Sequence, residues 1–385
     1  MGQGRSETAS GRMRGRIRLL VRGACLLAAF ATLWPLAAGE NLSRWVFSLS
    51  PFVSLFTAIA VRGFPLVVWL GVAVGIAAML RHRVFCRWIC PMGSCLEAAN
   101  RLGHHLKRGP ARWPLLGQWI VLLTLGGACL GYPLLLWLDP LALFAGAGLI
   151  AVFAMTVVWP GSWCGRVCPL GASQDLLHVA FASIRSLVGR KHDVVADAGL
   201  TRRIVLGAAA GAGSAAILSA VQSDSPRPLR PPNARAETQF RSLCTRCGNC
   251  LRACPTGVIE RDLGSCGLTS LLTPVLSFQN GYCREDCTRC TEVCPSGALS
   301  PLGARDKTKV RIGLARVDQD VCLLSEDHEC SACARWCPYG AIRYVFSETQ
   351  YCLQVQIDPG KCNGCGACEA ACPTKPHKAI IILPV

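Results

Sequence analysis

The feature that most limits what this chain can fold into is a cysteine run that occurs four times after residue 243 and always closes with Cys-x3-Cys-Pro. In the first and fourth runs the first gap has two residues, whereas in the second and third it has three and seven. The sixteen cysteines are Cys244, Cys247, Cys250 and Cys254; Cys283, Cys287, Cys290 and Cys294; Cys322, Cys330, Cys333 and Cys337; and Cys362, Cys365, Cys368 and Cys372. In such a run three thiolates bind one [4Fe-4S] cluster and the fourth reaches a neighbouring cluster. The sequence therefore predicts four [4Fe-4S] clusters.

Disulfides and zinc are the other common roles of clustered cysteines. A zinc site is built from paired CxxC knuckles and has no recurring proline behind a fourth cysteine. The fourfold repetition of one pattern favours iron–sulfur clusters over both alternatives. Four clusters in one domain indicate a relay for single electrons.

The order of the runs suggests how they share their clusters. The first and fourth runs have the strict spacing, and the second and third are neighbours with a longer first gap. We therefore expect the first run to pair with the fourth and the second with the third. In that arrangement Cys372 completes the first cluster, Cys254 the fourth, Cys337 the second and Cys294 the third.

The composition predicts a membrane part, because 51% of the residues are hydrophobic and the mean hydropathy is +0.36. Five apolar stretches are candidates to cross a bilayer. They are residues 17–39, 64–80, 115–138, 141–160 and 204–221.

The net charge of +17 does not indicate nucleic-acid binding, because the excess lies outside the cysteine-rich part. Lys and Arg gather in the N-terminal tail and in the segments 81–112 and 166–203, whereas the two intervening loops carry only Arg44 and Arg62. By the positive-inside rule these three basic segments are cytoplasmic. After five crossings the cysteine runs would lie on the periplasmic side.

The fifth span begins at Thr201-Arg202-Arg203 and continues as an Ala/Gly-rich stretch, which is typical of a twin-arginine export signal. The alternative is that the two arginines only mark the cytoplasmic end of a helix. A domain that receives clusters in the cytoplasm would have to cross the membrane already folded. We expect the span to be retained as an anchor, followed by an extended Pro/Arg-rich linker over residues 223–236.

The predicted membrane half contains an internal repeat. Cys86 and Cys90 precede Pro91, Cys164 and Cys168 precede Pro169, and two spans come before each motif. Repeats in membrane proteins often place a site where the two halves meet. We hypothesise that the four cysteines jointly hold one further redox centre, most simply another iron–sulfur cluster. A thiol–disulfide pair in each motif, or cysteines that only shape a turn, are the alternatives.

Haem is not expected, because none of the seven histidines lies inside a predicted span and the chain has no CxxCH motif. If the chain oxidises a quinol, it also needs proton acceptors. The candidate carboxylates near the membrane surfaces are Glu40, Glu97, Asp139 and Asp175.

Residues from about 200 to 385 resemble the NapG family of exported four-cluster ferredoxins. The resemblance rests on the twin-arginine start, the linker Leu229–Pro232, the order of the runs and the segment Cys294–Leu299. Residues from about 17 to 175 resemble NapH, the membrane partner of NapG, in the paired Cys-x3-Cys-Pro motifs. The resemblance implies a quinol dehydrogenase that delivers electrons to a periplasmic acceptor, often a cytochrome c. The chain lacks the cytoplasmic pair of clusters that usually ends a NapH-like protein.

We therefore expect a helical membrane domain with about five transmembrane helices, followed by an α+β ferredoxin-like domain with four clusters. The expected segments are 1–200 for four helices, 201–222 for the fifth, 223–236 for the linker and 237–385 for the polyferredoxin. The leading function is electron transfer in the bacterial inner membrane, from quinol to a periplasmic cytochrome c or reductase. The alternative is a maturation or regulatory electron donor for assembly of a periplasmic metalloenzyme.

Overall fold

The computed structural model describes residues 9–33, 42–63, 68–146, 148–188, 198–221, 227–279, 281–326, 328–349 and 351–385. The chain divides into unit 1, which is Met1–Gln222 with Ser242–Cys247, and unit 2, which is Ser223–Arg241 with Gly248–Val385. Some predictions lie outside the described residues. They concern Glu40, residues 34–39 and 64–67 of the first two expected spans, and residues 223–226 of the expected linker.

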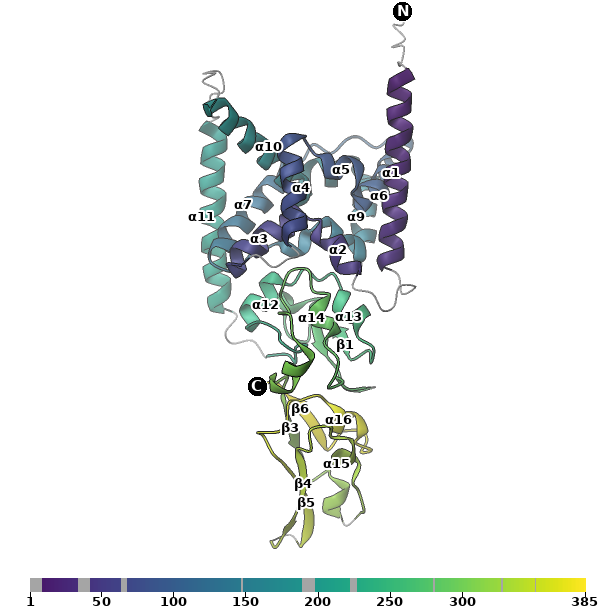
Figure 1. Cartoon of the computed structure of the whole chain (residues 1–385), viewed down its shortest axis with the longest axis vertical. Coiled ribbons are helices and arrows are strands. Elements are labelled where there is room, and N and C mark those ends of the chain that lie inside the picture. Colours follow the sequence, from purple (N-terminus) through teal and green to yellow (C-terminus); the bar gives the residue numbers. More distant parts are fainter. Residues whose placement is uncertain are drawn as a thin grey trace, which may run out of the picture. The chain divides into compact units, whose positions relative to one another are not determined.

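All regular secondary structure in the described residues of unit 1 before position 222 is helical (Figure 1). Its helices are α1 (Ala9–Leu33), α2 (Leu42–Ser48), α3 (Pro51–Val61), α4 (Val68–Leu80), α5 (Val84–Trp88), α6 (Pro91–His105), α7 (Leu116–Cys129), η2 (Leu136–Leu138), α8 (Pro140–Ala145), α9 (Gly148–Val158), the π-helical turn η3 (Trp163–Val167), α10 (Pro169–Val188) and α11 (Ala198–Val221).

Only one described helix is long and apolar enough to cross a bilayer by itself, over Arg202–Ala220 in α11. Four shorter helices, α3, α4, α7 and α9, are also apolar. The stretch expected as one span over 115–138 is divided, because α7 ends at Cys129, Gly131 is left-handed (φ 80°) and the short η2 follows. The domain with five membrane-spanning helices therefore remains a prediction.

The internal repeat is visible in the order and packing of the helices. Helices α3, α4, α5 and α6 in the first half correspond to α8, α9, η3 and α10 in the second. The halves exchange partners, because α6 packs on α9 while α10 packs on α4. Ser50 and Asp139 cap α3 and α8 at equivalent places, each followed by a proline, and the Ser50 hydroxyl donates to Asp139 Oδ1 at 2.6 Å.

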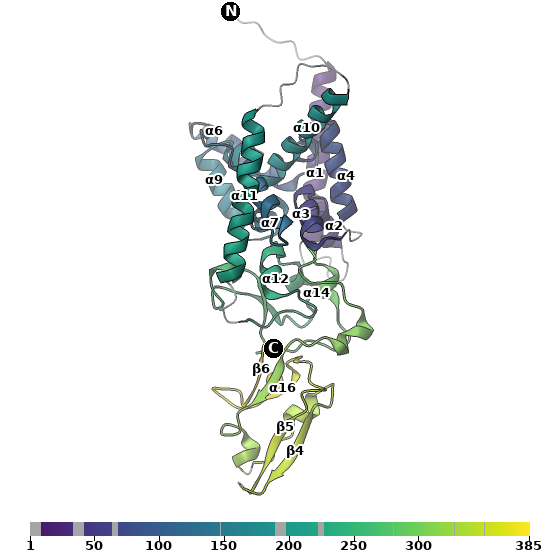
Figure 2. The ribbon, with the colours of Figure 1, turned by 90° about the vertical axis from the view of Figure 1, so that its left-hand side faces the viewer.

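Helix α11 lies against α7 (Figures 1 and 2). The contact needs glycine on both helices: a Cβ on Gly126 would come within 1.9 Å of the Ala208 oxygen, and one on Gly211 within 2.2 Å of the Leu123 oxygen. Gly207 and Gly211 are four residues apart, the small-residue spacing that lets helix backbones approach closely. Helix α11 is therefore an integral part of unit 1.

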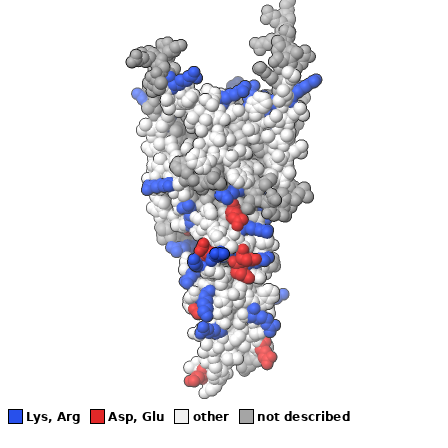
Figure 3. All heavy atoms as spheres, in the orientation of Figure 1, with Lys and Arg blue, Asp and Glu red and all other residues white. Residues whose placement is uncertain are grey.

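The visible face of unit 1 carries basic groups at the end where α5 and α10 lie (Figure 3). Exposed side chains in this part of the sequence are Arg81, Arg87, Arg101, Lys107, Arg108 and Arg185.

Unit 2 consists of short helices and three two-stranded antiparallel sheets. The sheets pair β1 (Ile259–Arg261) with β2 (Pro274–Leu276), β3 (Leu314–Val317) with β6 (Ile380–Leu383), and β4 (Ile342–Ser347) with β5 (Cys352–Ile357). In register, Ile259 pairs with Leu276, Leu314 with Leu383, and Ile342 with Ile357. The helices are α12 (Glu237–Leu243), α13 (Asn249–Ala253), η5 (Leu268–Ser270), α14 (Arg289–Glu292), η6 (Ala304–Lys309), η7 (Leu323–Glu326), α15 (Ala332–Trp336) and α16 (Ala367–Ala371).

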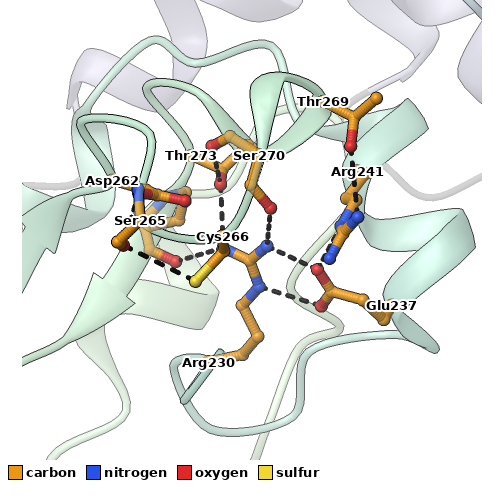
Figure 4. Close-up of polar contacts among 10 residues, drawn as sticks. Arg230, Glu237, Arg241, Asp262, Ser265, Cys266, Thr269, Ser270 and Thr273 are labelled. Atoms are coloured by element: carbon orange, nitrogen blue, oxygen red, sulfur yellow. Dashed lines mark hydrogen bonds and ion pairs between the residues drawn. The ribbon is translucent and has the colours of Figure 1, made fainter. Parts of the chain in front are cut away.

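The described part of the expected linker, residues 227–236, packs into unit 2 instead of running free. Arg230 is 8% exposed, and its guanidinium donates to both Glu237 oxygens (2.9 and 2.6 Å), to the Thr273 hydroxyl (2.8 Å) and to the Ser270 hydroxyl (3.1 Å) (Figure 4). It also lies over the Phe240 ring, 4.6 Å from its centroid. A buried guanidinium needs such partners, which is why the segment is ordered.

Candidate iron–sulfur sites

The third cysteine of each run lies on a one-turn helix. These cysteines are Cys250 on α13, Cys290 on α14, Cys333 on α15 and Cys368 on α16. A residue before proline is excluded from the helical region, so the chain leaves the helix at the fourth cysteine. The ψ angles of Cys254, Cys337 and Cys372 are 113°, 106° and 124°, all extended. The proline thus turns the fourth thiol away from its own run.

The second run forms one hollow with the last cysteine of the first run. Cys254, Cys283, Cys287 and Cys290 line a space with an empty volume of about 330 Å³. Its other walls include Pro255, Val258 and Leu276. Three thiols from one loop and a fourth from another are the ligand set that a [4Fe-4S] cluster requires.

The third and fourth runs form two more hollows in the same reciprocal way. Cys322, Cys330 and Cys333 share a space of about 340 Å³ with Cys372. Cys362, Cys365 and Cys368 share one of about 300 Å³ with Cys337. No disulfide joins the cysteines of these hollows.

The expected pairing of the first run with the fourth, and of the second with the third, is wrong. Cys254 lies with the second run, Cys372 with the third and Cys337 with the fourth. The reason is local: the β1–β2 and β4–β5 hairpins reverse the chain between consecutive runs and bring them back together. Cys250 belongs to unit 2, whereas Cys244 and Cys247 are grouped with unit 1.

The second and fourth runs lie back to back within unit 2. The backbone N–H of Cys283 donates to the oxygen of Cys365 at 2.8 Å. The Phe278 ring fills the space beside Gly366, where a Cβ would come within 2.2 Å of it. The hollow of the second run is therefore in direct contact with the loop that lines the next one.

Burial makes the bare thiols poor acids. It raises the pKa of Cys290 to about 12 and that of Cys365 to about 11. The pKa of Cys283 is also raised by burial, although Lys307 opposes the shift. Metal ligation must therefore displace a proton from these three thiols.

Unit 1 contains a larger chamber that is lined by Cys86, Cys90, Cys164 and Cys168. Its empty volume is about 1040 Å³ on the same measure, roughly three times that of each hollow in unit 2. The two motifs that the sequence separates by 78 residues (164 − 86) thus meet at one cavity.

The cysteines before proline have similar surroundings in both halves of unit 1. The Sγ of Cys90 and of Cys168 each accepts the N–H of the glycine three residues later at 3.4 Å, so the sulfur acts as the cap of the following helix. Seven residues after each of these cysteines stands a carboxylate held by an arginine: Arg22 pairs with Glu97, and Arg83 pairs with Asp175.

The polar groups beside the cysteines differ between the halves. His82 Nε2 lies 2.9 Å from Asp175 Oδ1, and Gln174 Nε2 lies 3.1 Å from Cys86 Sγ. At the equivalent positions of the other half stand Pro160 and Leu96. Sequence reasoning missed His82 and Gln174, although a residue-by-residue comparison of the two repeats would have marked both as departures.

The chamber has the donors that a metal cluster needs. Its four thiols are not joined by disulfides, and two buried polar atoms beside them, Gln174 Oε1 and Trp163 Nε1, have no hydrogen-bond partner. Among the described residues, no three His, Cys, Asp or Glu side chains are close enough to hold a single metal ion.

Two family models match the chain. The model described as a 4Fe-4S dicluster domain matches residues 243–298 and 328–375, which contain most of the four runs. The model described as a 4Fe-4S binding domain matches residues 62–110 and 141–190, each of which contains one Cys-x3-Cys-Pro motif. The second double match follows the internal repeat of unit 1.

Several curated proteins are similar to this chain. The methylamine utilization ferredoxin-type protein MauM of Methylobacillus flagellatus is 34% identical over 196 residues, which are 48% of this chain and 80% of MauM. The ferredoxin-type protein NapF of Escherichia coli K12 is 34% identical over 38% of this chain and 80% of its own length. The ferredoxin-type protein NapG of the same organism is 36% identical, over 41% of this chain and 71% of NapG. No solved structure matches the chain.

Proposed function

We propose that this chain, which belongs to the ferredoxin-type iron–sulfur proteins that include MauM, NapF and NapG, carries single electrons from a membrane quinol to a periplasmic redox partner. The observation that carries the proposal is the reciprocal sharing of cysteines in the three hollows of unit 2. Each hollow fits one [4Fe-4S] cluster, which supplies one-electron chemistry when bound. The spacing of the first run predicts the fourth cluster.

Unit 2 supports a relay by the order of its binding loops. Cys254 of the first run lines the hollow of the second run. The Cys283 N–H of the second run donates to the Cys365 oxygen of the fourth run. Cys372 of the fourth run lines the hollow of the third run. These contacts place the hollows of unit 2 next to one another, as a relay requires. The periplasmic partner would be a cytochrome c or a reductase, and no nucleic acid is involved.

Unit 1 would be the NapH-like half that meets the quinol in the lipid. Cys86, Cys90, Cys164 and Cys168 would hold a further iron–sulfur centre in the chamber. The chamber is larger than each hollow of unit 2, and a quinol head beside the centre is part of the proposal.

The polar groups at the chamber suit the release of protons. Oxidation of a quinol would release two protons and two electrons, and iron–sulfur centres held by the cysteines would take up the electrons one at a time. Asp175, which is paired with Arg83, is the candidate proton acceptor beside the chamber, and His82, whose side chain is 59% exposed, would pass the proton to the surface. Arg83 donates to Asp175 Oδ1 at 2.7 Å and to the Cys164 carbonyl at 3.1 Å, so it fixes the carboxylate beside the cysteine loop.

The topology that we propose follows the charges. The N-terminus and the two Cys-x3-Cys-Pro motifs would be cytoplasmic, α11 would be the last of five crossings of the inner membrane, and unit 2 would be periplasmic after twin-arginine export.

The test is reduction of the clusters by a quinol. Membranes that contain the full chain are mixed anaerobically with menadiol, and the loss of visible cluster absorption is followed. We expect reduction by menadiol, and at least a tenfold slower rate in Cys86→Ser and Cys164→Ser. Clusters that dithionite reduces but menadiol does not would refute quinol oxidation. Reduction that occurs only when a maturing metalloenzyme is added would support an assembly factor instead.

A further inference from the structure

A lysine is fully buried beside the second cysteine run. Lys307, in η6, is 1% exposed, although lysine is among the residues least often buried. Its Nζ donates to Cys283 Sγ at 3.2 Å, to the Arg284 carbonyl at 2.7 Å and to the Cys287 carbonyl. The amine therefore lies directly on the loop that carries two ligands of the second hollow.

These contacts define the form of the lysine. Three acceptors surround Nζ, and only the ammonium form has the three N–H donors that satisfy them all. A charge taken out of water needs compensation from nearby dipoles or from an opposite charge. Two carbonyls and one sulfur supply the dipoles, and a thiolate-ligated cluster supplies the negative charge.

We propose that Lys307 raises the reduction potential of the cluster held by Cys254, Cys283, Cys287 and Cys290, which makes this cluster the preferred resting place for an electron in unit 2. Reduction adds one negative charge, and a buried positive charge stabilises the reduced form more than the oxidised form. Hydrogen bonds to the ligating sulfur act in the same direction. Lys307 acts through the Cys283 ligand and not on iron itself.

The other two hollows are different in this respect. Cys337 Sγ accepts the backbone N–H of Ala341 at 3.4 Å, and Cys372 Sγ contacts the Thr374 hydroxyl at 3.1 Å. Lys378 donates to the Cys372 carbonyl and not to its sulfur, and it is only partly buried. Uncharged donors to sulfur shift a potential less than a buried cation does.

The position of the cluster in the second-run hollow suggests what its raised reduction potential would do. Its loop is bonded to the fourth run through Cys283 and Cys365, so it stands at the junction of the two dicluster parts of unit 2. A cluster of higher reduction potential at this junction would receive electrons from one dicluster part before they pass to the other part. The inference requires a cluster in this hollow, but it does not require that the electrons come from quinol.

The experiment is a potentiometric titration of the full chain, followed by electron paramagnetic resonance of the reduced clusters. Lys307→Met removes the charge and keeps the length of the side chain. The control is Lys309→Met, which removes the same charge from the same helix at a side chain that is 78% exposed. Lys307→Gln keeps one donor without the charge.

We expect the most positive reduction step to shift negative in Lys307→Met, with at least a tenfold lower ratio of reduced to oxidised cluster at a fixed potential, or about 59 mV for one electron. Lys307→Gln should shift the same step in the same direction, and Lys309→Met should leave all steps in place. Unchanged steps in a Lys307→Met protein with full iron content would overturn the proposal. Loss of this cluster from both Lys307 variants would also overturn it, because the lysine would then be a structural support.

Discussion

At the scale of single residues, the cysteine before a proline has one backbone conformation in both units. The ψ angles are 113° at Cys254, 106° at Cys337 and 124° at Cys372 in unit 2, and 115° at Cys90 and 116° at Cys168 in unit 1. In unit 2 this residue follows a helix and sends its thiol to another loop. In unit 1 it precedes a helix, whose first turn it caps through sulfur.

The new pairing can be tested at Cys254. The structure places its thiol with the second run, so Cys254→Ser should remove or shift the reduction step that Lys307→Met also moves. Cys372→Ser is the matched variant, and it should alter a different step. The same titration decides the point, and a Lys307-sensitive step that responds to Cys337→Ser and not to Cys254→Ser would restore the pairing of the second and third runs.

Glu237 predicts a pH dependence of unit 2. Burial raises its pKa, but hydrogen bonds from Arg230 and Arg241 outweigh this and hold the pKa below the ordinary value of 4.5. Because the folded-state pKa is depressed, this carboxylate stabilises the fold above pH 4.5 and loses its effect as the pH falls below that value.

The measurement is the temperature at which cluster absorption is lost, taken from pH 7 down to pH 3. Glu237→Gln should lower it by several degrees at pH 7, consistent with a loss of about 1–3 kcal/mol for a buried charged partner, and the difference should vanish at low pH. Glu260→Gln, at an exposed position, is the control. Equal pH profiles for both variants would show that the Arg230 cluster does not depend on the carboxylate.

At the scale of elements, the sequence predicted the loops that bind metal but not which loops meet. The spacing of the run from Cys362 to Cys372 is sufficient to predict a helical turn that ends at Pro373. The pairing of runs depends on the β1–β2 and β4–β5 hairpins, whose strands include three-residue β1 and β2, too short for hydropathy alternation to be read reliably. Similar spacing of two runs did not predict that they share a hollow, because each hairpin brings together the two runs that are consecutive in sequence.

The packing of α11 on α7 gives a prediction at the same scale. Gly211→Leu should force the two helices apart, because a Cβ there would lie 2.2 Å from the Leu123 oxygen, and overpacking of this kind costs about 1–3 kcal/mol or more. Gly213→Leu on the same helix meets nothing within 4 Å and is the matched control. The yield and melting temperature of the detergent-purified chain should fall for Gly211→Leu alone. Equal behaviour of the two variants would contradict the close packing.

At the scale of the whole molecule, the structure divides the chain between Gln222 and Ser223 but also groups Ser242–Cys247 with unit 1, so the domain bounds 1–200, 201–222, 223–236 and 237–385 stay a prediction. The repeat of unit 1 was readable from Cys86, Cys90, Cys164 and Cys168. The network of His82 with Asp175 was not, because it joins residues that are 93 apart (175 − 82) and only helix packing brings them together. Nor did the sequence indicate that Arg230 would be buried, since a Pro/Arg-rich segment has the composition of a linker.

Export of unit 2 is a prediction about the whole chain. If Arg202 and Arg203, both exposed at the start of α11, form a twin-arginine signal, then replacing both with lysine should leave unit 2 in the cytoplasm. Protease added to spheroplasts should then cleave unit 2 at least tenfold less. Arg81→Lys is the control for a basic residue outside the signal. Full cleavage of the double variant would mean that the arginines only mark a helix end.

The most direct test of the account is the iron and acid-labile sulfide content of the anaerobically purified full chain. We expect about sixteen iron atoms and as many sulfides from four [4Fe-4S] clusters, with additional iron from the chamber of unit 1. A variant with Cys86, Cys90, Cys164 and Cys168 all replaced by serine should lose only that additional iron. A colourless chain with zinc, or with neither iron nor sulfide, would contradict the account.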